Sequence, residues 1–215
     1  MTNFTDRLRE ENRADWTATV EHRFVDEIFR GAIDPQAMRR YLVQDYQFID
    51  RFTALVGAAI AFADRFESRI RFAQFAAMIT SDENTYFQRA FDALGVPATE
   101  RAAPALSPVT TAFQELMHAA AQSRDYGCCL AVLSVAEGIY LDWADRPGAA
   151  LPPDFIHAEW ITLHNNDGFR AFVTWLHGEL DRVGAALAPD QAELARKYFS
   201  RAVQLERAFF DHIFA

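Results

Sequence analysis

Apolar residues recur at helical spacing along the whole chain of 215 residues, and no stretch shows the strict alternation typical of a half-buried strand. Glycine and proline contribute only 9 and 8 residues, too few for a turn-rich all-β chain. Apolar residues make up 51% of the sequence, which is enough for a sizeable core. The sequence therefore predicts an all-α protein, and its length fits a single domain over residues 1–215.

Start and stop signals divide the chain into about seven or eight helices. Asp34 and Pro35 predict a helix start, because the Asp side chain caps free N–H groups and proline fits the first helical position. Three prolines between positions 97 and 108 mark the clearest loop. The expected helices cover residues 6–22 with an irregular continuation to 29, then 35–63, 67–94, 109–122, 125–144, 154–164, 168–186 and 190–214. We expect them to form one helical bundle.

The charge balance argues against several classes of partner. The chain has 30 acidic and 21 basic residues, a net charge of −9 and no basic stretch, so neither nucleic acid nor an anionic membrane surface is expected as a partner. No uncharged run approaches the roughly 20 residues of a membrane span. The polar N-terminus lacks the apolar segment of a secretory signal. We expect a soluble cytoplasmic protein.

Three acidic residues occupy helix positions where a core residue is expected. Asp45 interrupts the apolar stripe formed by Met38, Tyr41, Leu42, Phe48 and Ile49. Glu137 interrupts the stripe of Leu130, Leu133 and Tyr140. Glu206 interrupts the stripe of Phe199, Val203 and Phe210. Glu83, between Thr80 and Phe87, is a weaker case. A single buried acid commonly pairs with an arginine or caps a helix. Three inward-facing acids, one on each of three helices, favour a single polar pocket on which the three helix faces converge. Burial there would raise the pKa values of the acids and suit them to proton transfer.

Aromatic residues flank these acids, and they are Tyr41, Tyr46, Phe48, Tyr140, Trp143, Phe209 and Phe210. Acids and aromatics together suit a small, flat, polar heterocycle. For most of the phenylalanines, packing in the core is the simpler interpretation.

A metal centre and a thiol nucleophile are the alternatives that the residues leave open. Glu115 and His118 have the Glu-x-x-His spacing of di-iron bundles, but they share a polar helix face and we expect them to be solvated. Asp154 and His157 have a similar spacing at a helix start, and none of the three inward acids has a histidine three residues later. We therefore expect no metal, and a di-iron oxidase is the alternative function.

Two adjacent cysteines, Cys128 and Cys129, could in principle supply a thiolate nucleophile. Because a bridge between neighbours would be strained, no disulfide framework is expected. Small cysteines on an apolar face more often serve packing, which is the interpretation that we prefer.

Five motifs in order resemble the TenA family, thiaminase II and its relatives, over nearly the whole chain. They are Trp16 with His22–Val25, Gly31 and Asp34-Pro35; Tyr41–Tyr46; Ser107-Pro108; Trp160-Ile161; and Leu205–Phe210. The resemblance implies an all-α, haem-oxygenase-like bundle without bound haem, and a homodimer or homotetramer without a cofactor. One branch of the family carries a nucleophilic cysteine in a Pro-Cys-x-Trp-x-Tyr motif. Here Ala136 takes the cysteine position and Glu137 follows it, which resembles the cysteine-less branch marked by a glutamate.

The resemblance implies a role for each matching residue. Asp45 falls on the aspartate that grips an aminopyrimidine, Glu206 on the catalytic glutamate, and Tyr140 on the tyrosine after the cysteine motif. Without a thiol, Glu137 would activate a water for direct attack. Three further candidate substrate-binding positions fall where the cysteine branch has tyrosines, and these are Phe48, Thr111 and His164.

The function implied is the hydrolysis of an aminomethyl- or formylaminomethyl-aminopyrimidine, or of thiamine, to hydroxymethyl-pyrimidine. The small-molecule aminopyrimidine is the expected partner. Loss of the family nucleophile also leaves open a non-catalytic helical binding or regulatory protein.

Overall fold

The computed structural model describes residues 3–214, and of residue 82 the backbone alone. Within this range there are thirteen α-helices, one π-helical turn and no strand, so the predicted all-α class is confirmed. The first elements are α1 (Phe4–Glu11), α2 (Arg13–Val20), α3 (Arg23–Phe29), α4 (Pro35–Tyr46), α5 (Phe48–Phe62), α6 (Phe66–Met78) and the π turn η1 (Ile79–Glu83). The later ones are α7 (Asn84–Ala93), α8 (Ala98–Ala102), α9 (Pro108–Gln122), α10 (Tyr126–Ala144), α11 (Phe155–Leu163), α12 (Asp167–Gly184) and α13 (Pro189–Ile213).

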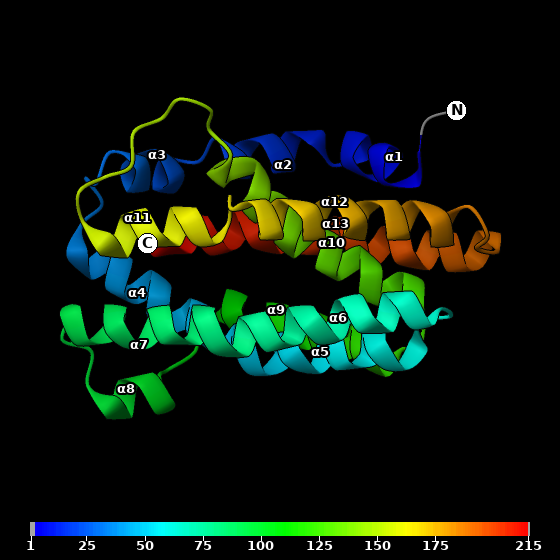
Figure 1. Cartoon of the computed structure of the whole chain (residues 1–215), viewed down its shortest axis with the longest axis horizontal. Coiled ribbons are helices and arrows are strands. Elements are labelled where there is room, and N and C mark those ends of the chain that lie inside the picture. Colours follow the sequence, from blue (N-terminus) through cyan, green and yellow to red (C-terminus); the bar gives the residue numbers. More distant parts are fainter. Residues whose placement is uncertain (1–2, 215) are drawn as a thin grey trace.

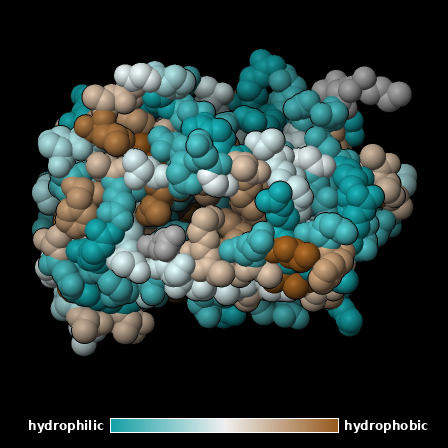
Figure 2. Space-filling model, in the orientation of Figure 1, coloured by the Kyte–Doolittle hydropathy of each residue, from teal (hydrophilic) through white to brown (hydrophobic). Residues whose placement is uncertain are grey.

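The helices lie in three tiers in the view of Figure 1: α1 to α3 along the top, α10 to α13 through the middle, and α5, α6, α7 and α9 below. The central helix α10 packs against both α12 and α13. It is long and apolar enough to cross a membrane, but 83% of its most apolar window is buried within the chain, as in the core helix of a folded protein. The surface facing the reader in Figure 2 is mostly hydrophilic, with a few separate hydrophobic patches.

Several of the predicted helix starts are confirmed by side-chain caps. Asp34 Oδ1 accepts hydrogen bonds from the backbone N–H groups of Gln36 and Ala37 at 2.9 and 3.1 Å. Ser107 and Asp125 cap α9 and α10 in the same way. These caps satisfy backbone donors that a helix leaves unpaired at its first turn.

The prediction of seven or eight helices was too low, because hydrogen bonds to near and to distant residues break the longer ones. The side chain of Asn12 donates to the carbonyl of Leu8 where α1 ends, and His22 Nδ1 caps α3 by accepting from Phe24 N. The predicted helix 35–63 divides at Gln47, whose carbonyl accepts from Gln114 Nε2 at 2.6 Å. The predicted helix 67–94 is divided by η1, and the predicted loop 97–108 contains the short α8.

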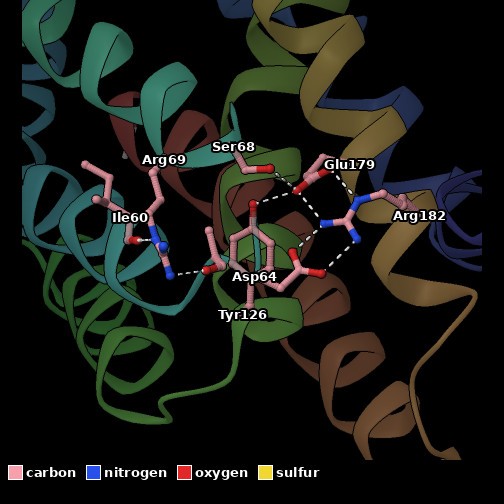
Figure 3. Close-up of polar contacts among 8 residues, drawn as sticks. Ile60, Asp64, Ser68, Arg69, Tyr126, Glu179 and Arg182 are labelled. Carbon is pink, nitrogen blue, oxygen red and sulfur yellow. Dashed lines mark hydrogen bonds and ion pairs between the residues drawn. The ribbon is translucent and has the colours of Figure 1, made fainter. Parts of the chain in front are cut away.

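A network of ionic and hydroxyl groups joins α6, α10 and α12 (Figure 3). Arg182 donates to both oxygens of Glu179, at 2.8 and 2.7 Å, and to Asp64 in the turn after α5. Ser68 and Tyr126 donate to the same oxygen of Glu179, at 2.6 and 2.9 Å. Burial alone would raise the pKa of Glu179, but the hydrogen bonds from Arg182, Ser68 and Tyr126 outweigh it and lower that pKa. This buried acid is therefore fully partnered and structural.

Candidate active site

Asp45, Glu137 and Glu206 line one cavity, which we call the acid cavity. They come from α4, α10 and α13, so the predicted convergence of the three carboxyl groups is confirmed. The cavity measures about 70 Å³, several times the roughly 10–15 Å³ needed for one water molecule. Its other lining residues are Phe48, Ile49, Phe52, Ile79, Glu83, Phe113, Met117, Ala136, Tyr140, Trp160 and His164.

The break between α4 and α5 brings Asp45 and Phe48 to the same cavity. At the break, the N–H of Gln47 bonds to the carbonyl of Gln44 three residues back, which tightens the last turn of α4. The side chain of Gln47 donates to the carbonyl of Arg101, and its own carbonyl is held by Gln114. Contacts from two other segments therefore fix the bend, and both Asp45 and Phe48 line the cavity.

A chain of hydrogen bonds positions the carboxyl group of Asp45. The indole N–H of Trp160 donates to the hydroxyl of Tyr41 at 3.1 Å, and the hydroxyls of Tyr41 and Tyr140 lie 2.8 Å apart. The hydroxyl of Tyr140 donates to Asp45 Oδ1 at 3.1 Å. Because Tyr140 has a single hydroxyl hydrogen and gives it to Asp45, Tyr41 must donate to Tyr140, so the donors run from Trp160 through both tyrosines to Asp45. Oδ2 of Asp45 is left without a hydrogen bond among the described residues, and can meet a ligand.

The acids of the cavity hold their protons unusually tightly. Burial raises the pKa of Asp45 to about 7, although the hydrogen bond from Tyr140 opposes the shift. Burial raises the pKa values of Glu206 and Glu137 well above the ordinary range. Nearby carboxyl groups add to the shift, chiefly Asp45 for Glu206 and Glu83 for Glu137. Among the described residues neither glutamate side chain has a hydrogen-bond partner, in contrast to Glu179, so the pair is available to a ligand.

Glu83, the weaker case in the sequence, is the fourth acid of the cavity. Burial and the charge of Asp45 raise its pKa to about 8. It ends the π turn η1, in which hydroxyl side chains occupy backbone carbonyls: Thr80 bonds to that of Ala76 at 2.8 Å and Ser81 to that of Ala77 at 2.7 Å. The sequence did contain a signal for this π turn, the cluster of hydroxyl residues inside a predicted helix, because hydroxyl side chains that bond to backbone carbonyls stabilise a distorted turn. Such π turns occur frequently at functional sites.

Phe48 and His164 lie in the wall of the cavity, whereas Thr111 does not. Thr111 is exposed on α9, so its predicted place in the pocket was wrong. It precedes Phe113 by two residues, about 200° around the helix, and Phe113 is the residue that faces the cavity. The neighbouring Thr110 points inward, but its hydroxyl is held by Gln44 Oε1 at 2.8 Å.

The alternative metal ligands and the cysteines lie elsewhere. Glu115 and His118 are exposed on α9, as predicted, and Asp154 caps α11. Within residues 3–214, side chain 82 aside, no group of three or more His, Cys, Asp or Glu side chains is arranged to hold a metal ion. Cys128 and Cys129 are fully buried, and burial raises the pKa of each thiol to about 12. At neutral pH both are therefore protonated and poor nucleophiles.

Replacing Cys129 with Ser is expected to preserve most activity per folded molecule, because Ala136 rather than a cysteine lines the acid cavity. The measurement is turnover of the purified variant, with Cys128→Ser as the matched control. A loss of more than about a hundredfold, near 2.7 kcal/mol of activation free energy, in Cys129→Ser alone would revive a thiol mechanism.

The four raised carboxyl pKa values also predict that the unliganded protein loses stability as pH rises from about 6.5 to 8.5. In the unfolded chain these acids ionise near pH 4, whereas the folded protein keeps protons on Asp45 to about 7 and on Glu83 to about 8. The folded state then binds more protons, so the free energy of unfolding falls with pH. The slope is about 1.4 kcal/mol per pH unit for each carboxyl still protonated.

Urea unfolding across this pH window measures the effect, and Glu83→Gln should flatten the slope. The window starts at 6.5 because the buried His157 and His164 and the half-buried His177 have lowered pKa values and act in the opposite direction below it. Stability that rises between pH 6.5 and 8.5 would contradict the assigned burial of the acids.

The structure thus defines an all-α protein with an internal cavity lined by carboxyl groups and aromatic rings. The TENA/THI-4/PQQC family matches residues 9–214, and the chain belongs to this family. The resemblance inferred from the motifs is therefore confirmed.

Relatives of known structure share the fold across almost the whole chain. A TenA homologue from Pyrococcus furiosus is 20% identical, with a TM-score of 0.87 over 98% of this chain and 99% of that one. A TenA family transcription regulator from Silicibacter sp. TM1040 is also 20% identical, with a TM-score of 0.85 over 96% and 94%. Among curated proteins, the aminopyrimidine aminohydrolase of Bacillus subtilis (strain 168) is 22% identical over 167 residues, 78% of this chain and 71% of that protein.

Proposed function

We propose that this protein hydrolyses the exocyclic C–N bond of a small aminopyrimidine, an aminomethyl or formylaminomethyl derivative, and releases hydroxymethyl-pyrimidine. Thiamine is the largest candidate substrate. The observation that carries the proposal is the set of four carboxyl groups around one aromatic cavity, three of them without a hydrogen-bond partner among the described residues. The name of the Bacillus subtilis relative supports the same chemistry.

Asp45 is the proposed anchor for the pyrimidine edge. That edge offers an exocyclic amino donor beside a ring nitrogen acceptor, so one proton must lie between the ring nitrogen and the carboxyl group. A pKa of about 7 lets Asp45 share this proton near neutral pH. Tyr140 holds the carboxyl in place through its bond to Oδ1.

Glu206 and Glu137 are proposed to move the protons of the reaction. The leaving nitrogen must depart with a proton, and Glu206 is kept neutral by burial, as a general acid requires. Glu137 acts as the base in its ionised form, so its own proton must first leave to solvent. The carboxylate then accepts a proton from the attacking water as the C–O bond forms and the C–N bond breaks. For the aminomethyl substrate, one water is consumed and one ammonia is released.

The test is a substrate panel of thiamine, the aminomethyl-pyrimidine and its N-formyl derivative, with hydroxymethyl-pyrimidine detected by chromatography. Hydrolysis of at least one, abolished in a Glu137→Gln, Glu206→Gln double variant, is the expected result. Binding without turnover would instead support a non-catalytic binding protein. The absence of both binding and turnover would refute the proposal. The cytoplasmic location and the homodimer or homotetramer stay predictions.

A further inference from the structure

A second cavity adjoins the acid cavity. It measures about 230 Å³, and the two cavities share Ile79, Glu83, Glu137 and His164 as lining residues. We call these four shared residues the neck. The rest of the second cavity is formed by Phe75, Met78, Leu163, Asn166 and Phe169, and is therefore mainly apolar.

His164 presents a hydrogen-bond acceptor to the neck, independently of the carboxyl groups. Its Nδ1 lies 2.8 Å from the carbonyl oxygen of Trp160, and since a carbonyl can only accept, Nδ1 carries the hydrogen. Burial lowers the pKa of His164 to about 4, so the ring is neutral and Nε2 has a free lone pair. His164 is only 6% exposed, and its Nε2 has no hydrogen-bond partner among residues 3–214.

The neck therefore brings together two carboxyl groups and one ring-nitrogen acceptor. The side chains of Glu83 and Glu137 also have no hydrogen-bond partner in the described part of the chain, and neither cavity has a Lys or Arg among its described lining residues. A positively charged ligand in the neck would favour the ionised form of these carboxyl groups, and its N–H donors could bond to them and to Nε2 of His164. An ammonium group has three such donors and one positive charge.

We propose that Glu83 and Nε2 of His164 form a binding site for the substrate's exocyclic nitrogen in its ammonium form. This inference rests on the proposed function and adds Glu83 as a residue that determines specificity for amines over alcohols. A nitrogen that arrives neutral takes its proton from Glu206 and is then held as a cation by these two groups, while Glu137 faces the attacking water. The hydroxymethyl product has no charge and a single O–H donor, so it binds this site weakly and leaves.

The test compares two ligands that differ only at this group, aminomethyl- and hydroxymethyl-aminopyrimidine, by calorimetry at pH 7. Both are measured in the Glu206→Gln background, in which the amine is not consumed. Adding Glu83→Gln should weaken binding of the amine about 10- to 100-fold, the usual worth of a hydrogen bond to a charged group. Binding of the alcohol should change less than about threefold. Glu67→Gln, an exposed acid on α6, is the matched control and should change neither.

His164→Asn is the second variant, and it should also weaken binding of the amine more than binding of the alcohol. Equal effects on the two ligands, or no effect of Glu83→Gln on the amine, would overturn the inference while leaving the proposed function intact. If the unaltered protein bound neither pyrimidine, the proposed function would fall and this inference with it. Thermal unfolding of each variant shows whether the fold is retained, and Glu83→Gln should raise rather than lower stability at pH 7, because folding disfavours the ionised form of this carboxyl.

Discussion

Replacing Glu206 with Gln is expected to lower turnover by about a hundred- to ten-thousandfold, the usual worth of general acid–base catalysis. The substitution keeps the size and polarity of a side chain that is only 3% exposed, but it removes the proton that the leaving nitrogen needs. The affinity for hydroxymethyl-pyrimidine should be similar to that of the unaltered protein. Steady-state turnover and pyrimidine affinity, measured under identical conditions, provide the comparison.

Asp45→Asn is the matched control, because Asp45 is assigned to binding rather than to proton delivery. It should mainly weaken pyrimidine affinity. Some loss of turnover is also expected, because Asp45 contributes to the raised pKa of Glu206 and coupled sites are not additive. Near-normal turnover in Glu206→Gln would contradict its role and make Glu137 the leading candidate for the acid.

Replacing Arg182 with Met is expected to lower the free energy of unfolding by about 3 kcal/mol or more. The change leaves Glu179, 6% exposed, with two hydroxyl donors but no positive charge beside it. An uncompensated buried charge accounts for most of the expected loss. Urea unfolding at pH 7 measures it, and adding Glu179→Gln to the Met variant should restore part of the stability.

Arg196 provides the control for Arg182, because it pairs with Glu193 three residues earlier on the exposed face of α13. Arg196→Met should produce little measurable change, since exposed ion pairs contribute little. If both arginine variants had equally small effects, the network in Figure 3 would not be a significant source of stability.

Much of the fold could be predicted from local signals. Capping residues such as Asp34 and Ser107 mark true helix starts, and their side chains satisfy the expected backbone donors. The break inside the predicted helix 35–63 could not be predicted, because it depends on partners far away in sequence. The bend at Gln47 is held by Gln114 and by the carbonyl of Arg101, and neither contact leaves a trace in the sequence around residue 47.

The site shows the same division between local pattern and tertiary context. Asp45, Glu137 and Glu206 interrupt regular α-helical stripes, so periodicity alone predicted that they face inward. Glu83 lies where the helix changes to a π turn, and a count based on 3.6 residues per turn loses accuracy there. Thr111 was misplaced because its position came from the resemblance, whereas helical spacing already placed it opposite Phe113.

The π turn η1 holds one residue more than an α-helical turn, because its hydrogen bonds join residues five rather than four apart. Deletion of one residue between Ile79 and Glu83 would therefore let α6 and α7 join as a continuous α-helix with little change in the orientation of α7. The same deletion at Gln88 or Arg89, inside α7, would turn the residues that follow by about 100° and shift them by about 1.5 Å, which would carry the buried Ala90 and Phe91 away from the core. We therefore expect a single-codon deletion scan to show that folding survives deletions in η1 better than deletions inside α7.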